Sequence, residues 1–236
     1  MRVPNDWLLT AERIAVHLPS KTAVVADLHL GYAEARRCSG EAVPDDAVDE
    51  QLSGLGQALQ RHGAKRLVVA GDLLEDGHCR DALAVFREWL RETDVELSAL
   101  VPGNHDRGFA DCGLQIADGS FRVGGWRVIH GDEPVPEGLV VQGHEHPCLR
   151  WRPKSRVIRP RVFGGRTTPG GIENPCYLVA PQRLILPAFS PEAAGVNVLS
   201  MRRWRAYRCM VVAGDRVMDL GEVAGLGRRL SAGQTR

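Results

Sequence analysis

Paired cysteines, long apolar runs and a large net charge are all missing from this 236-residue sequence. The six cysteines are scattered singly and none forms a C-x-x-C pair, so we expect neither a cysteine zinc site nor a small disulfide scaffold. No stretch of about 18 apolar residues occurs, which argues against a membrane-spanning helix. Polar residues interrupt residues 1–18, so we expect no signal peptide and a cytoplasmic, reduced protein.

The net charge of +1 hides an uneven distribution along the chain. Residues 1–118 carry 12 Lys+Arg and 20 Asp+Glu, a net charge of −8, whereas residues 119–236 carry 18 and 9, a net charge of +9. This asymmetry has two interpretations. It indicates either a basic face for a polyanion or a folded sandwich whose two halves neutralise each other.

Short apolar runs rich in Val, Ile and Leu recur between Gly, Pro and Asp, and we interpret them as buried strands. Apolar residues spaced four, three and four apart predict a helix over Pro44–His62, and Asp81–Arg91 predicts a second helix. The alternation of strands and helices implies an α/β fold with parallel pairing. The predicted strands are Thr22–Ala26, Arg66–Ala70, Leu97–Val101, Trp126–Ile129 and Leu139–Val141.

The second half of the chain changes character. Residues 148–175 hold seven basic residues and one acid, and we interpret residues 150–175 as a basic loop insertion. Cys209–Leu220 predicts a hairpin. We expect a single domain over residues 1–223, followed by a flexible tail over residues 224–236.

Five short polar clusters carry the chemistry, and each directly follows an apolar run. Because ligands bind at the carboxyl ends of strands in open α/β sheets, five strand ends can converge on one point. Any one cluster alone is more typical of a turn, a helix cap or a surface histidine than of a metal site. The clusters are Asp27-Leu28-His29, Gly71-Asp72, Gly103-Asn104-His105-Asp106, His130-Gly131-Asp132 and Gly143-His144-Glu145-His146.

Spacing within the clusters predicts which side chains converge. Asp27 and His29 lie two residues apart, so in an extended segment they point the same way while Leu28 faces the core. Asn104 and His105 are adjacent and should point apart, so one can bind a metal while the other faces substrate. Imidazole, carboxylate and amide ligands suit Mn²⁺, Fe or Zn²⁺ better than Ca²⁺.

In this order the clusters resemble the motifs of the calcineurin-like metallophosphoesterases, which read D-x-H, G-D, G-N-H-[DE], H and G-H-x-H. The resemblance spans residues 22–147, and no ligand of the pattern is missing. It implies a four-layer αββα sandwich, in which two mixed β-sheets are flanked by helices. It also implies a dinuclear metal centre that hydrolyses phosphoric esters.

The resemblance implies two ligand groups that share one carboxylate. The first is Asp27, His29, Asp72 and His146, and the second is Asp72, Asn104, His130 and His144. His105 would stabilise the attacked phosphate or protonate the leaving oxygen, with Asp106 orienting its ring. A hydroxide that bridges two divalent ions would attack in line. Mn²⁺ is the expected metal, with Fe or Zn²⁺ as alternatives.

A narrower likeness covers Asp27–Tyr32, Gly103–Arg107, Gly143–Pro147 and Leu184–Phe189 and extends to about residue 199. These residues are similar to small prokaryotic phosphoesterases that include the ligase-associated DNA-damage-response endonucleases. That likeness implies a nuclease with DNA-repair partners. The chain departs from the family in its basic insertion and in Ser190-Pro191-Glu192.

Several basic and acidic residues have two interpretations each. Arg37 and Arg107 either contact substrate phosphate or pair with nearby acids. Glu75 or Asp76 either supports the site near Asp72 or caps a helix. The basic run 150–166 with Trp151, and Met201–Arg208 with Trp204 and Tyr207, either bind nucleic acid through stacking and charge or form solvated surface.

The sequence therefore predicts a phosphodiesterase that acts on a phosphodiester substrate, with DNA or RNA preferred. A small-molecule phosphatase or a nucleotide pyrophosphohydrolase on the same centre is the alternative. A non-catalytic interaction scaffold is disfavoured because such scaffolds tend to have lost their ligands, and every ligand is present here.

Overall fold

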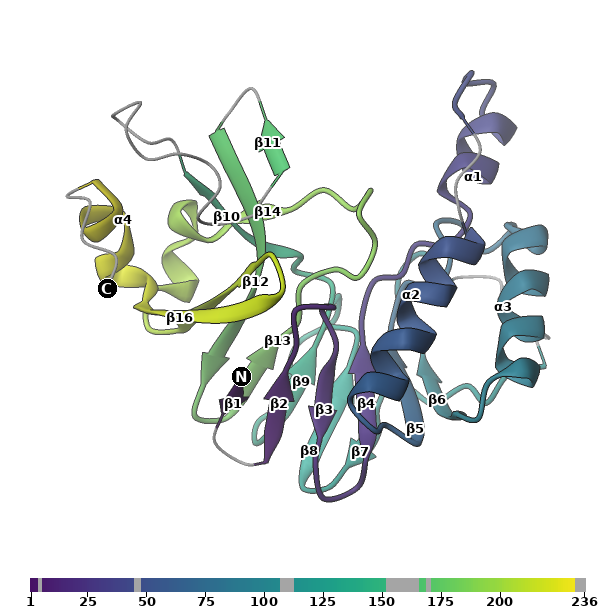
Figure 1. Cartoon of the computed structure of the whole chain (residues 1–236), viewed down its shortest axis with the longest axis horizontal. Coiled ribbons are helices and arrows are strands. Elements are labelled where there is room, and N and C mark those ends of the chain that lie inside the picture. The colour runs from purple at the N-terminus through teal and green to yellow at the C-terminus, as the bar shows by residue number, and fades with distance from the viewer. Residues whose placement is uncertain (4–5, 45–47, 107–112, 152–165, 169–170, 232–236) are drawn as a thin grey trace.

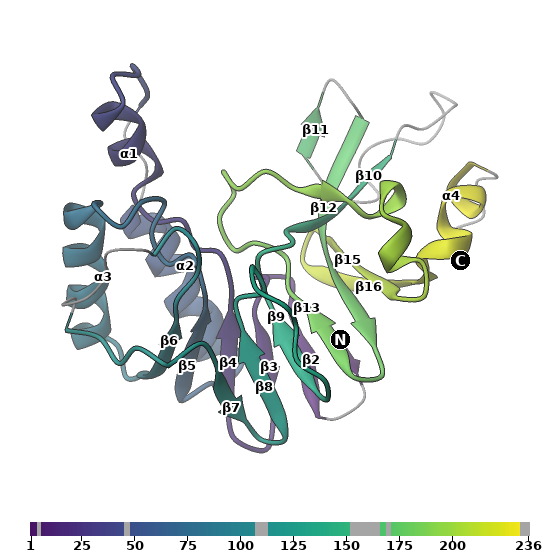
Figure 2. The same ribbon diagram turned by 180° about the vertical axis from the view of Figure 1, so that it is seen from behind.

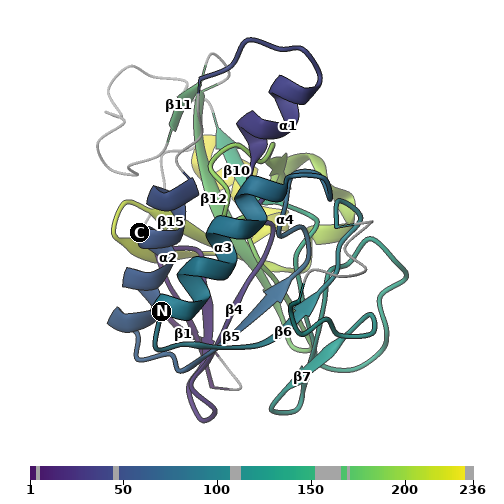
Figure 3. The same ribbon diagram turned by 90° about the vertical axis from the view of Figure 1, so that its right-hand side faces the viewer.

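The computed structural model describes residues 1–3, 6–44, 48–106, 113–151, 166–168 and 171–231 (Figure 1). Two β-sheets face each other, and helices lie outside the first sheet. Figure 2 shows the same sheets from behind, and Figure 3 shows helices α2 (Val48–Arg61) and α3 (Arg80–Glu92) covering the first sheet.

The first sheet holds six strands in the order β1-β2-β3-β4-β5-β6. Its first three pairings are antiparallel, whereas β4–β5 and β5–β6 are parallel. Parallel pairing aligns the carboxyl ends of the last three strands at one edge. The strands are β1 (Arg2–Val3), β2 (Trp7–Leu9), β3 (Ala15–His17), β4 (Thr22–Val25), β5 (Arg66–Ala70) and β6 (Glu96–Val101).

Three helices belong to this half of the chain. The crossovers from β4 to β5 and from β5 to β6 contain α2 (Val48–Arg61) and α3 (Arg80–Glu92). The short α1 (Tyr32–Cys38) follows β4 and projects beyond the other helices (Figures 1 and 2). The strand-end clusters and both long helices agree with the sequence prediction, whereas α1 was not foreseen.

The second sheet is mixed and runs β14-β10-β12-β13-β9-β8-β7, with β11, β15 and β16 attached through β12. Strands β8 and β13 both pair in parallel with β9. The strands are β7 (Phe121–Val123), β8 (Trp126–Ile129), β9 (Val140–Gln142), β10 (Pro147–Trp151), β11 (Arg166–Thr168), β12 (Gly171–Ala180), β13 (Arg183–Ile185), β14 (Val196–Asn197), β15 (Arg208–Ala213) and β16 (Arg216–Glu222).

Three apolar cores separate the layers. One packs α2 and α3 on the first sheet, a second fills the space between the sheets, and the third packs α4 (Val223–Ser231) on the second sheet. Burial of these faces drives the layers together. The four-layer αββα sandwich of two mixed sheets and flanking helices is therefore confirmed.

Two expectations for the second half were wrong in part. Residues 223–231 form a helix rather than a flexible tail, because Val223, Leu226 and Leu230 share one buried face. Part of the expected loop insertion pairs as β11 and β12. Residues 152–165 and 232–236 lie outside the described residues. The predicted hairpin over Cys209–Leu220 is confirmed by β15 and β16.

The described helices include none that combines the length and the apolarity needed to cross a bilayer.

Candidate metal centre

The seven expected ligands lie at one edge of the sandwich, where strands of both sheets end. Asp27, Asp72 and Asn104 follow β4, β5 and β6 of the first sheet, whereas His130 and His144 follow β8 and β9 of the second. The site therefore forms only when the two sheets pack together.

The backbone at this edge is locally strained. Asp27, His29, Asp72, His144 and His146 all have positive φ angles, of 55°, 47°, 48°, 64° and 40°. This left-handed region is unfavourable for residues with a Cβ and is typical of functional sites. The extended segment expected for the first cluster is thus wrong, although Leu28 is buried in the core as predicted.

Two glycines make room for the ligands. A Cβ on Gly103 would lie 2.2 Å from Oδ1 of Asp72, and a Cβ on Gly71 would lie 1.9 Å from Nδ1 of His130. Both distances are far inside van der Waals contact. These two positions therefore require glycine for the carboxylate and the imidazole to keep their places.

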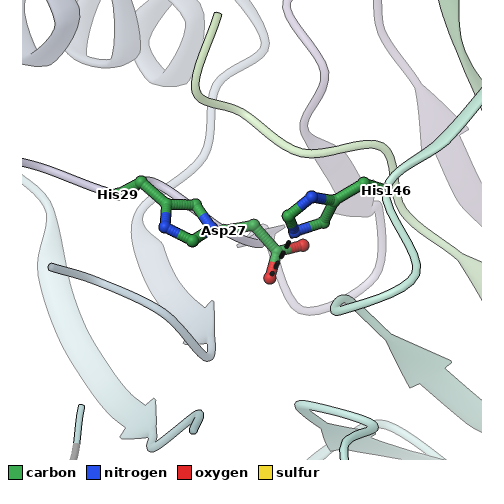
Figure 4. A group of neighbouring side chains, drawn as sticks. All are labelled: Asp27, His29 and His146. Atoms are coloured by element: carbon green, nitrogen blue, oxygen red, sulfur yellow. Dashed lines mark ion pairs between the residues drawn. The ribbon is translucent and has the colours of Figure 1, made fainter. Parts of the chain in front are cut away.

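One ligand group consists of Asp27, His29 and His146, whose ligand atoms all lie within 4.8 Å of one another (Figure 4). Nε2 of His146 is 3.5 Å from Oδ1 of Asp27. Nε2 of His29 and Nε2 of His146 are both buried, and neither has a hydrogen-bond partner among the residues that the structure describes. Buried polar atoms are rarely left unpaired, so two such nitrogens beside a buried carboxylate fit a cation.

The second group surrounds Nε2 of His130. That nitrogen lies 3.1 Å from Oδ1 of Asn104, 3.1 Å from Nδ1 of His144 and 3.3 Å from Oδ2 of Asp72. Ligand atoms bound to one Zn²⁺-like ion at 2.0–2.2 Å lie about 3.0–3.5 Å apart. The spacing of these four atoms therefore fits one coordination sphere.

The environment of His130 favours positive charge. Its Nδ1 lies 3.2 Å from the carbonyl of Ala70, which leaves Nε2 to face the other ligands. Burial opposes the charged ring, but the hydrogen bond with Asp72 and the charges of Asp72 and Asp27 outweigh burial and raise the pKa of His130 to about 9. A proton on the ring or a divalent cation bound at Nε2 would each supply this positive charge.

Asp72 lies between the two groups. Its Oδ2 is 3.3 Å from Nε2 of His130 and 3.9 Å from Nε2 of His29, while its Oδ1 accepts a hydrogen bond from the backbone N–H of His105. Burial would raise the pKa of Asp72, but its contacts with His130 and His105 lower it to about 2. An ionised carboxylate that lies between His29 and His130 is suited to act as a ligand that bridges two cations.

The support expected for His105 comes from a different residue. Nδ1 of His105 lies 2.6 Å from the backbone carbonyl of Glu75. Asp106, expected to orient that ring, instead accepts hydrogen bonds from the backbone N–H groups of Gly103 and Leu74. Asp106 binds these groups because buried N–H groups of the loop need acceptors. Burial raises the pKa of Asp106 to about 6.

Of the two acids considered near Asp72, the structure brings Glu75 into the site. Oε2 of Glu75 lies 2.8 Å from Nδ1 of His29. Asp76 instead accepts hydrogen bonds from the exposed His78. Sequence spacing alone did not separate the two acids, because both follow the same cluster.

The remaining candidates lie away from these contacts or outside the described residues. Arg37 is exposed on α1, and Arg107 falls outside the described part of the chain. Trp204, considered as a stacking platform, is only 2 % exposed and belongs to the third apolar core. Of the interpretations left open for this segment, stacking of Trp204 on bases is therefore not supported.

Comparisons with known proteins agree with this geometry. The sequence profile described as calcineurin-like phosphoesterase matches residues 20–144. The structure is similar to the crystal structure of Pseudomonas putida nuclease MPE, with a TM-score of 0.67 and 24 % sequence identity over 91 % of this chain and 94 % of that chain. That likeness shows a shared fold. A search among curated proteins gives no match.

Proposed function

The chain belongs to the calcineurin-like phosphoesterase family, and we propose that it is a metal-dependent phosphodiesterase that cleaves nucleic acid. The family hydrolyses phosphoric esters at a divalent metal centre. The finer assignment to nucleic acid is supported by the structural likeness to a nuclease and by the basic second half of the chain. We also propose a DNA-repair role, a cytoplasmic location and one catalytic domain, which α4 extends to Ser231.

The observation that carries this proposal is the pair of unpartnered imidazole nitrogens of His29 and His146 beside the buried carboxylate of Asp27. Together with the cluster around His130, they give two adjacent cation sites that share Asp72. We assign Mn²⁺ to both, because imidazole, carboxylate and amide ligands suit it. The proposed ligands are Asp27, His29, Asp72, Asn104, His130, His144 and His146.

When bound, such a cation pair polarises a phosphoryl oxygen and lowers the pKa of bound water to about 7. Two divalent ions bring a charge of about +4, and Asp27 and Asp72 together bring −2. Glu75, hydrogen-bonded to His29, adds one more carboxylate at the margin. The remaining positive charge attracts a phosphate group to this edge of the sheets.

His105 is the proposed proton donor. Its Nδ1–H donates to the carbonyl of Glu75, so Nε2 is free to face substrate. Its ring centroid lies 5.0 Å from that of His29, which places it at the rim of the proposed metal site. From there His105 would protonate the leaving oxygen or donate a hydrogen bond to the phosphate. Asp106 would act indirectly, by holding the loop that carries His105.

The test is hydrolysis of bis(p-nitrophenyl) phosphate with added Mn²⁺, followed by plasmid nicking and cleavage of single strands. We expect turnover that needs metal and that falls by about 10²–10⁴-fold in His105→Ala, the range typical of a lost general acid. A matched control is His78→Ala. His78 is exposed, and its side chain contacts Asp76 rather than a proposed ligand. No hydrolysis of any phosphate ester with Mn²⁺, Fe²⁺ or Zn²⁺ would contradict the proposal.

A small-molecule phosphatase or pyrophosphohydrolase is the second candidate, and one pocket favours it. A cavity of about 270 Å³ adjoins His146 and is lined by Arg13, Glu173 and Ser190 among others. Its size is close to that of small-ligand sites. Action on mononucleotides or dinucleoside polyphosphates alone, with no cleavage of plasmid or single strands, would favour this candidate over the nuclease.

A further inference from the structure

The 3₁₀ segment η3 (Arg202–Trp204) contacts the loop that carries the proposed ligands His144 and His146. β14 pairs in parallel with the start of β10, and the N–H of Val196 donates to the carbonyl of His146 at 2.8 Å. Arg203 forms an ion pair with Glu145, the residue between His144 and His146. The position of η3 is therefore fixed relative to the proposed metal centre.

α4 brings further arginines beside η3. The N–H of Ala224, in the first turn of α4, donates to the carbonyl of Arg205 at 3.0 Å. Arg228 lies four residues after Ala224 and so occupies the same face of the helix. Arg202, Arg205 and Arg228 are all exposed. Neither residues 198–208 nor residues 223–231 contain an acid.

These three arginines differ from their basic neighbours in their partners. Arg150, Arg208 and Arg216 each form an ion pair with an acid, namely Glu173, Asp219 and Asp215. No ion pair to Arg202, Arg205 or Arg228 is found among the residues that the structure describes. Exposed cations gathered without acids repel one another, and a polyanion would relieve that repulsion.

The aromatic residues of this region limit the kind of recognition. Trp204 is buried in the third core, with the guanidinium of Arg203 4.8 Å from its ring centroid. Tyr207 also packs against that core. The surface therefore offers charge rather than stacking platforms, which suits contacts with phosphates and not with bases.

We infer that Arg202, Arg205 and Arg228, called here the arginine surface, bind the phosphate backbone of a nucleic-acid strand whose scissile phosphate lies at the metal centre. This inference rests on the proposed function. It assigns the strand a path from the His144–His146 loop across η3, which Arg203 joins to that loop through Glu145, to α4. It also favours one of the two interpretations of the net positive charge of residues 119–236, namely a basic face for a polyanion rather than compensation for the negative residues 1–118.

The test uses the Mn²⁺-loaded protein and a fluorescent phosphorothioate 30-mer that resists cleavage. Anisotropy gives the binding constant at several salt concentrations. Each phosphate contact to a single strand contributes about 0.7 to the slope of log K against log [salt]. We expect the triple variant R202Q/R205Q/R228Q to lose about 2 from that slope and to bind more weakly at low salt. The three single variants should each lose about one third as much.

The matched control is K21Q/K65Q/R66Q, which removes the same charge from three exposed residues where β4 and β5 begin, at the opposite edge of the sheet. We expect its slope to equal that of the wild type. An unchanged slope in R202Q/R205Q/R228Q, or an equal loss in both triple variants, would overturn the arginine surface. Thermal unfolding confirms that each variant is folded.

Cleavage of an unmodified 30-mer by the wild type is measured in parallel. Cleavage combined with an unchanged slope in R202Q/R205Q/R228Q counts against the arginine surface alone. Absence of cleavage counts against the proposed nuclease function and against the inference that depends on it.

Discussion

Nδ1 of His29 lies 2.8 Å from Oε2 of Glu75, and this contact determines which nitrogen of His29 faces the proposed metal. With the proton on Nδ1, the lone pair of Nε2 points toward Asp27 and His146, where Nε2 has no hydrogen-bond partner. The backbone carbonyl of the same Glu75 accepts from His105. One residue thus orients both a proposed ligand and the proposed proton donor.

The first prediction concerns the Glu75 side chain. Glu75→Ala should weaken Mn²⁺ binding by about 10–100-fold, because outer partners of metal-bound histidines contribute on this scale. Glu75→Gln keeps an oxygen acceptor and should lose less. Calorimetric titration with Mn²⁺ measures both affinities.

Asp76→Asn is the control, because Asp76 contacts the exposed His78 rather than the proposed ligands. Wild-type affinity in Glu75→Ala would show that the His29–Glu75 contact does not support metal binding.

The second prediction concerns the close approach at Gly103. Gly103→Ala places a methyl group 2.2 Å from Oδ1 of Asp72, so Asp72 must move and both proposed metal sites should bind Mn²⁺ more weakly. Gly54→Ala, in α2 with no heavy atom within 4 Å of the new Cβ, should instead stabilise the fold by about 0.5–1 kcal/mol. Metal titration and thermal unfolding of both variants separate these effects, and normal Mn²⁺ binding by Gly103→Ala would refute the predicted displacement.

The third prediction concerns metal removal. A ligand that binds the folded state alone stabilises it by about 2.7 kcal/mol per site at one hundred times its Kd. Mn²⁺ should therefore raise the Tm of the wild type, and EDTA should reverse the rise. The rise should be much smaller in Asp72→Asn, because Asp72 is the carboxylate shared by both groups. An equal rise in both proteins would place the bound metal elsewhere.

The fourth prediction concerns pH and stability away from the site. Burial opposes ionisation of Glu12, but hydrogen bonds from His62 and Arg61 outweigh burial and lower its pKa. A carboxyl with a lowered pKa stabilises the folded state above its unfolded pKa, and that contribution is lost as the pH falls through the folded pKa. The stability advantage of the wild type over Glu12→Gln should therefore shrink between about pH 5 and pH 3.

The Glu12 effect should stay below about 1 kcal/mol, because the ion pairs are partly exposed. Urea unfolding of both proteins at several pH values measures it. A stability difference that does not change with pH would contradict the assignment to Glu12.

The positions of the five clusters could be predicted from the sequence, because apolar runs mark buried strands and polar residues directly after them lie at the strand ends. The parallel pairing of an α/β fold followed from the alternation of strands and helices, whereas the four-layer αββα sandwich was implied by the resemblance to the calcineurin-like metallophosphoesterases. Neither inference required a side-chain contact over long range.

The details that failed all depend on tertiary contacts. The left-handed backbone at Asp27 and His29 follows from loop closure, which the spacing of two residues does not reveal. The sequence offered Asp106 as the partner of His105, but buried N–H groups of Gly103 and Leu74 take that carboxylate. Trp204 is buried in the same apolar core as the buried residues of α4. We did not predict α4 from the sequence, because its glycines and arginines are not typical of a buried helix.

Anomalous diffraction from crystals grown with Mn²⁺ tests the central claim most directly. The account predicts two peaks per chain, one among Asp27, His29 and His146 and the other among Asn104, His130 and His144, with Asp72 between them. Peaks found only at other places on the surface, or no peak at this edge of the sheets, would contradict it.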